Sequence, residues 1–275
     1  MVKKLACFTM IVALLCSLTG CADSAKNQEA YDLFMQSAQS VNEQDGRYLN
    51  VFGMLTTEYN DQKSFMSMSG YYMQQVQDGK KLVDAIFSVS DTTSEEPTEY
   101  NYVTDGDRYA YVLDNEMTEM TEADFSQATG YGTLVTAFEA DAVKSVEVEQ
   151  PDESSTYTTY TMKLDKKKTA DLAARLLESI NLINTAQVPV EFDNSEVTAK
   201  IVVDAEGKPV SFGYTLKTDA TAEGETMGIS YNATFTVYQT GDEVQVNVTD
   251  LGSYLDAQAS SSETESSSEE SSAAE

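Results

Sequence analysis

Residues 210–217 read Val-Ser-Phe-Gly-Tyr-Thr-Leu-Lys, and residues 227–237 read Met-Gly-Ile-Ser-Tyr-Asn-Ala-Thr-Phe-Thr-Val. Apolar residues take every second position in both stretches, and small or polar residues take the positions between them. Because successive side chains of a β-strand point to opposite faces, this alternation predicts two strands with one buried and one solvated face. Residues 197–203 alternate in the same way, so the C-terminal part of the chain predicts an antiparallel sheet.

Strand signals also fill the N-terminal half. Asp78-Gly79 and Asp105-Gly106 lie between extended runs, and this dipeptide favours a tight hairpin turn. Successive hairpins of this kind form a meander. After Gly241-Asp242 the valines at 244, 246 and 248 alternate with polar residues and predict a last strand. The remaining strands are expected at residues 47–59, 63–77, 82–90, 98–104, 108–113, 143–150 and 155–164.

Two segments have the spacing of amphipathic helices. Residues 27–43 and residues 166–183 each repeat apolar side chains at intervals of three and four, which predicts one buried stripe per helix. Shorter helical turns are expected within residues 123–128 and 133–140. The expected fold class is mainly β (α+β), in one domain over residues 27–255. The helix stripes consist of Ala30, Leu33, Phe34, Ala38 and Val41 in the first helix, and Leu172, Leu176, Ile180 and Ile183 in the second.

The first 20 residues have the features of a secretory signal peptide. Lys3 and Lys4 form a positive start, residues 5–18 are almost entirely apolar, and Leu18-Thr19-Gly20-Cys21 follows. The apolar run is shorter than the roughly 20 residues that span a bilayer. A charged start, a short apolar region and small residues at a cleavage site are typical of a segment that is removed from the mature protein.

Leu18-Thr19-Gly20-Cys21 resembles the lipobox of bacterial lipoproteins. The resemblance implies cleavage between Gly20 and Cys21, and diacylglycerol and palmitate-type acyl groups on Cys21. Residues 21–26 would then be a lipidated tether, and the expected location is the outer, extracytoplasmic face of the cell membrane. Cys7 and Cys16 would leave with the signal peptide, so the mature chain could form no internal disulfide.

The composition excludes several functions. The formal net charge is −29, which repels nucleic acid and anionic surfaces, so a nucleic-acid partner is not expected and the lipid alone must hold the protein at the membrane. The chain has no histidine, which excludes Ser-His-Asp and Cys-His catalysis and histidine-ligated zinc. No phosphate-binding or nucleophile motif stands out. The sequence therefore predicts no catalytic residue, no metal, no cofactor and no enzyme activity.

Three charged segments carry weaker signals. The acidic residues between Asp91 and Glu153 suit the carboxylate pair of a hydrolase, a calcium site or a solvated face. The solvated face is the favoured interpretation, because no spacing singles out a carboxylate pair and the EF-hand pattern is absent. Lys163, Lys166, Lys167 and Lys168 form a basic cluster that suits either an anionic partner or a solvated loop. Residues 256–275 are rich in serine and glutamate without a basic or aromatic residue, which predicts a disordered tail.

The order of elements resembles the LolA/LppX-like superfamily of envelope proteins. The resemblance rests on the helix at 27–43 directly after the tether, the helix at 166–183 before a final sheet, and the hairpin at 203–210. It implies a curved antiparallel half-barrel wrapped around an N-terminal and a mid-chain helix.

That family includes carriers of lipids and lipoproteins, so the resemblance implies an apolar cavity that binds a lipid or lipoprotein. A second interpretation stays open, in which the protein is a non-enzymatic surface or structural lipoprotein whose core is filled by its own side chains. The expected ligand-binding residues are Phe212, Tyr214, Leu216, Ile229, Tyr231 and Phe235 from the strands, and Leu172, Leu176 and Ile180 from the second helix.

Overall fold

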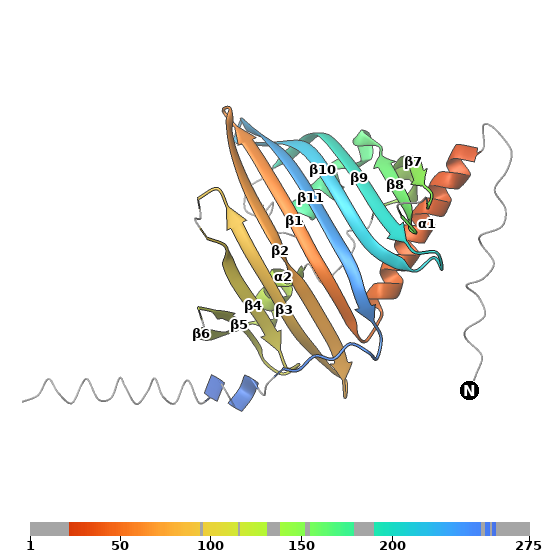
Figure 1. Cartoon of the computed structure of the whole chain (residues 1–275). Helices are drawn as coiled ribbons and strands as arrows, with labels where there is room; N and C mark the ends of the chain where they lie inside the picture. The colour runs from red at the N-terminus through yellow and green to blue at the C-terminus, as the bar shows by residue number, and fades with distance from the viewer. Residues whose placement is uncertain are drawn as a thin grey trace, which may run out of the picture.

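The computed structural model of this protein shows one large antiparallel sheet accompanied by α-helices (Figure 1). It describes residues 22–93, 96–114, 116–130, 138–151, 155–178, 190–248, 251–253 and 255–256. The predicted signal peptide and Cys21 lie outside these ranges, as does most of the expected tail. None of the described helices is long and apolar enough to cross a membrane.

The sheet has 11 strands in the order β6-β5-β4-β3-β2-β1-β11-β10-β9-β8-β7. β1–β6 and β9–β11 are meanders of adjacent hairpins, β8 pairs with β9 across a longer connection, and the two halves of the sheet join where β1 pairs with β11. β6 and β7 are the two open edges. The strands are β1 (Arg47–Tyr59), β2 (Gln62–Gln77), β3 (Lys80–Asp91), β4 (Thr98–Thr104), β5 (Tyr109–Leu113), β6 (Glu116–Met120), β7 (Val143–Glu149), β8 (Thr158–Leu164), β9 (Glu191–Val203), β10 (Pro209–Ala222) and β11 (Glu225–Thr240).

The predicted hairpins are confirmed. The turn between β2 and β3 has both Asp78 and Gly79 at positive φ, as the tight turn of a two-residue hairpin requires. Asn60 and Asp61 take positive φ between β1 and β2, so an asparagine and an aspartate make this turn without glycine.

The helices differ from the prediction at their ends. α1 (Ala22–Asn42) begins five residues early, so residues 22–26, expected to be a tether, belong to the helix. α2 (Glu122–Ala128) is capped by Thr121, whose side chain accepts a hydrogen bond from the Asp124 amide. The turn expected at 133–140 lies mostly outside the described residues, and the short 3-10 helix η2 spans Ala140–Ala142.

The second predicted helix is divided in two. A 3-10 turn, η3 (Lys166–Lys168), precedes α3 (Ala170–Glu178). The carboxylate of Asp165 caps η3 by accepting from the Lys167 amide, and the buried Thr169 hydroxyl donates to the Ser195 carbonyl in the sheet. Thr169 therefore ties the break between the two helices to β9. Ile180 and Ile183 lie outside the described residues.

The strand predicted at residues 244–248 is wrong. Val244 and Val246 are buried, but this segment forms no strand; the Val246 amide donates to the Gln75 side chain at 3.1 Å. Beyond it, Leu251 and Leu255 pack on Ala110 at the other end of the sheet. The Leu251 amide donates to the carboxylate of Asp105. The valines alternate with polar residues because one side of this extended segment packs on the protein. The segment does not pair with a strand of the sheet.

The helices lie mainly at the two ends of the sheet. α1 contacts β7, β8 and β10, α3 contacts β9, and α2 contacts β5. We call the side of the sheet that carries Val51, Phe212 and Phe235 the inner face, because the α1 side chains pack on it, and the opposite side the outer face. In Figure 1, α1 crosses the end of the sheet where β7 and β8 lie.

Candidate functional site

The inner face carries every strand residue that was predicted to bind a ligand. Phe212 pairs with Phe235 across β10 and β11, Leu216 pairs with Tyr231, and the remaining strand residues continue the same two rows. Leu172 and Leu176 of α3 belong to the same hydrophobic cluster. None of these side chains is more than 7% exposed. The structure thus brings the predicted residues together, except Ile180, which lies outside the described residues.

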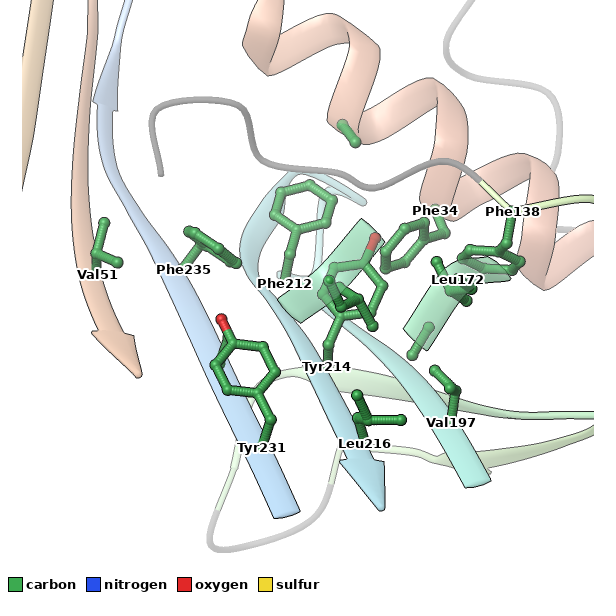
Figure 2. Packing of buried hydrophobic residues seen from close by; sticks show 14 of the residues in the cluster. Phe34, Val51, Phe138, Leu172, Val197, Phe212, Tyr214, Leu216, Tyr231 and Phe235 are labelled. Atoms are coloured by element: carbon green, nitrogen blue, oxygen red, sulfur yellow. The ribbon is translucent and has the colours of Figure 1, made fainter. Parts of the chain in front are cut away.

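Four aromatic rings join α1 to this face. Phe34 of α1 is fully buried, and its ring centroid lies 5.6 Å from that of Phe212 and 5.8 Å from that of Tyr214, both edge-on. Phe138 lies 5.6 Å from Phe34 on the other side. Figure 2 shows these rings between α1 and the strands, with Phe235 and Val51 farther along the sheet. Edge-to-face contacts of this kind add stability beyond area burial.

Small residues form a line across the inner face that the sequence analysis missed. Each of four central strands carries one glycine or alanine between two larger residues: Ala233 in β11, Gly53 in β1, Gly70 in β2 and Ala85 in β3. Ala233 lies directly opposite Gly53, and the later strands are shifted diagonally. A strand-by-strand search for Gly or Ala at inner positions would have found this line, which we call the small-residue line.

Gly53 and Gly70 are glycines for different reasons. A Cβ atom on Gly70 would overlap the carbonyl oxygen of Ile86 in the next strand, so the backbones approach too closely for any side chain. A Cβ atom on Gly53 would meet only the Tyr231 ring at 3.9 Å and the Met68 methyl at 4.0 Å, which is ordinary contact. The backbone therefore demands glycine at position 70 but not at position 53.

A buried arginine closes one end of the inner face. Arg47 is 6% exposed, donates to Asn42 at 2.8 Å and to Gln74 at 2.9 Å, and lies over the Tyr72 ring at 5.4 Å. Its Nε has no hydrogen-bond partner among the described residues. Asn42 is the last residue of α1, so the guanidinium lies at the negative end of the helix dipole. Arg47 thereby fixes the end of α1 to β2 without a carboxylate.

The basic cluster predicted at residues 163–168 is not a free positive patch. Lys163 pairs with Glu147, Lys166 with Glu196, and Lys168 with Asp141. Each pair joins neighbouring strands or elements at the surface, where such pairs add little stability. These three lysines are thus neutralised by neighbouring acids.

Asp84, on the outer face of β3, provides a test of stability against pH. Burial raises the pKa of its carboxyl, and its Oδ1 has no hydrogen-bond partner among the described residues. Stability that depends on the protonated form is present below the unfolded-state pKa of about 3.9, and it is lost as pH rises through the raised folded-state pKa. At neutral pH the ionised Asp84 is therefore a cost to the folded state.

We expect Asp84→Asn to raise the melting temperature at about pH 7 and to change it little at about pH 4. Thermal unfolding followed by circular dichroism at both pH values measures this. Glu99→Gln, at an exposed outer position of the neighbouring strand β4, is the matched control and should change neither value. An equal shift for Asp84→Asn at both pH values would contradict the assignment.

Comparisons with known proteins give only distant likenesses. No protein-family model matches the sequence, and no curated protein matches it. LprF from Mycobacterium bovis aligns with 80% of this chain and 96% of its own, at 9% identity and a TM-score of 0.38. A putative outer membrane lipoprotein-sorting protein domain from Vibrio parahaemolyticus aligns with 83% of this chain and 96% of its own, at 9% identity and 0.26.

A DUF1329 family protein from Desulfovibrio piger aligns with 83% of this chain and 96% of its own, at 11% identity and a TM-score of 0.26. Each of these three solved structures aligns with most of this chain, but few of the aligned residues are identical. Likenesses of this size carry no conclusion about function.

Proposed function

We propose that this protein is a lipid-anchored extracytoplasmic protein that holds an acyl chain of a lipid or lipoprotein against the middle of its inner face. The observation that supports this is that apolar residues cover more strands of the inner face than the described helices contact. The described helices lie mainly on β5 and β7–β10, whereas apolar inner positions, which are also buried, continue through β11, β1, β2 and β3. Between Leu49 and Leu55 the inner row of β1 contains no polar side chain.

The middle of this face has a suitable shape and chemistry. Four strands about 4.8 Å apart, over a length of about six residues each at roughly 3.3 Å per residue, give an apolar area roughly 14 Å wide and 20 Å long. Along the small-residue line the side chains are shortest, and the rings of Tyr72, Phe87, Tyr231 and Phe235 rise beside it. Apolar surface of this extent favours a flexible hydrocarbon ligand over a polar one.

The second candidate is a structural lipoprotein whose core holds no ligand. One observation favours it: the predicted ligand-binding side chains are all nearly fully buried in one continuous cluster. A protein of this kind would have the same anchor and the same fold. The two candidates differ in whether the protein takes up lipid, which is the quantity to measure.

Gly53→Leu is the test variant, because Gly53 belongs to the small-residue line and a Cβ atom there meets no backbone atom. We expect native mass spectrometry of the wild-type protein from its own membranes to show co-purified lipid, and cis-parinaric acid to fluoresce on binding. Gly53→Leu should reduce both signals and leave the melting temperature nearly unchanged. Ser69→Leu, at an exposed outer position of β2, is the control and should bind like the wild type. A wild-type protein without lipid and without probe uptake would instead support the structural candidate.

The anchor is tested separately. Cys21→Ser removes the thiol that lipidation requires, so we expect it to abolish incorporation of a clickable fatty acid and to leave the chain uncleaved or released from the membrane. Metabolic labelling followed by gel fluorescence measures this. The matched control is Ser24→Cys, which places a second thiol three residues later without altering Cys21 and should not change the label. Label on the Cys21→Ser chain would contradict the anchor.

A further inference from the structure

A polar hollow of about 380 Å³ lies on the outer face, opposite the proposed lipid surface. Its floor is the outer row of β11, where Gly228 and Ser230 present almost no side chain. Longer residues of the neighbouring strands surround this floor: Glu58 of β1 pairs with Gly228, and Lys217 of β10 pairs with Ser230. The hollow therefore arises from two short side chains between rows of long ones.

A bulge in β9 completes one wall. The pairing of β9 with β10 shifts between Lys217 and Asp219, and Asn194 takes a positive φ of 54° there. This bulge directs the Asn194 amide to the carboxylate of Asp219, to which it donates at 3.0 Å. Bulges re-aim side chains in this way and often lie next to binding sites.

The walls offer donors and acceptors in alternation. Lys63 pairs with Glu58 at 3.2 Å on one side, and Asn194 with Asp219 on the other. Lys217 pairs with Glu196 across β10 and β9, and its ammonium makes no hydrogen bond or ion pair with the described residues. These groups suit a ligand that both donates and accepts many hydrogen bonds, as hydroxyl groups do.

An exposed aromatic ring stands beside the hollow. Phe65 of β2 lies opposite Thr56, which lines the hollow, and is 48% exposed on the same outer face. Phe52 and Met54 continue this apolar surface along β1. A ring next to hydrogen-bonding groups binds ligands that are apolar on one side and hydroxylated on the edge.

The charge around the hollow favours neutral ligands over anionic ones. Glu58, Glu196 and Asp219 outnumber Lys63 and Lys217 around the hollow, and the whole chain has a net charge of −29. Anionic ligands are therefore repelled. Within the described residues no group of acids, cysteines or histidines is arranged to hold a metal ion. We propose that the hollow, with Phe65 as its platform, binds a neutral saccharide, independently of any lipid on the inner face.

The test measures binding of maltohexaose and of tetra-N-acetylchitotetraose to the purified mature protein by isothermal titration calorimetry. Phe65→Ala removes the platform, and Gly228→Gln fills the hollow, where a new Cβ meets only Glu58 atoms at 3.8 Å. We expect at least one of the two saccharides to bind, and both variants to weaken it at least about tenfold.

Each test variant has a control in which the same kind of substitution is made at a position away from the hollow. Tyr157→Ala removes an exposed ring elsewhere, and Thr236→Gln lengthens an outer residue at the other end of β11. Both should bind like the wild type. No binding of either saccharide at millimolar concentration, or unchanged binding in both test variants, would overturn the proposal. Preferential binding of trigalacturonate or triglycine would also overturn it, because the ligand would then be an anion or a peptide.

Discussion

Phe34→Ala is expected to lower the free energy of unfolding by about 3–5 kcal/mol, the usual cost of truncating a buried phenylalanine. Phe34 has no exposed surface and touches rings from β10 and from Phe138. Its removal takes away the central contact between α1 and the sheet and leaves a cavity that three other rings cannot close. Urea unfolding followed by circular dichroism of residues 22–275 measures the change.

Phe52→Ala provides the matched control for this experiment. Phe52 lies on the outer face of β1 and is 45% exposed, so its truncation removes the same atoms from a site that is already half in water. We expect a cost of about 1 kcal/mol or less. Similar losses for the two variants would mean that α1 does not pack on the sheet as the structure shows.

Repetitive local patterns made most of the sheet predictable. β1 and β4 have the predicted bounds, because alternating apolar residues end at Asn60-Asp61 and Asp105-Gly106 turn signals. β6 was missed, since Glu-Met-Thr-Glu-Met shows little alternation. It forms because Asp114 takes a positive φ and turns the chain back onto β5. Pairing with an existing edge, rather than propensity, determines this strand.

Features that depend on register could not be predicted. The small-residue line and the outer hollow need the pairing of strands that are far apart in sequence, such as β1 with β11. The position of Arg47 could not be predicted either, because only the pairing of β1 with β2 places it next to Gln74. By contrast, the rows containing Phe212 and Phe235 could be predicted, because both strands alternate strictly and are joined by a short turn.

Gly70→Ala is expected to destabilise the protein by about 3 kcal/mol, at the upper end of the usual cost of overpacking. The new methyl group would overlap the backbone oxygen of Ile86, and backbone cannot rotate away as a side chain can. β2 and β3 must then move apart where Gly70 faces Phe87, which weakens the hydrogen bonds between them. Urea unfolding gives the loss, and faster amide exchange in residues 85–88 would locate it.

Gly53→Ala is the matched control, because it adds the same methyl group on the same face, one strand away. The Cβ atom would lie at ordinary contact distance from Tyr231 and Met68, and it would reduce the conformational entropy of the unfolded chain. We therefore expect Gly53→Ala to be neutral or to stabilise the protein by about 0.5 kcal/mol. Equal losses at the two positions would show that the inner face is uniformly packed, which would remove the space over Gly53 that the acyl-chain proposal requires.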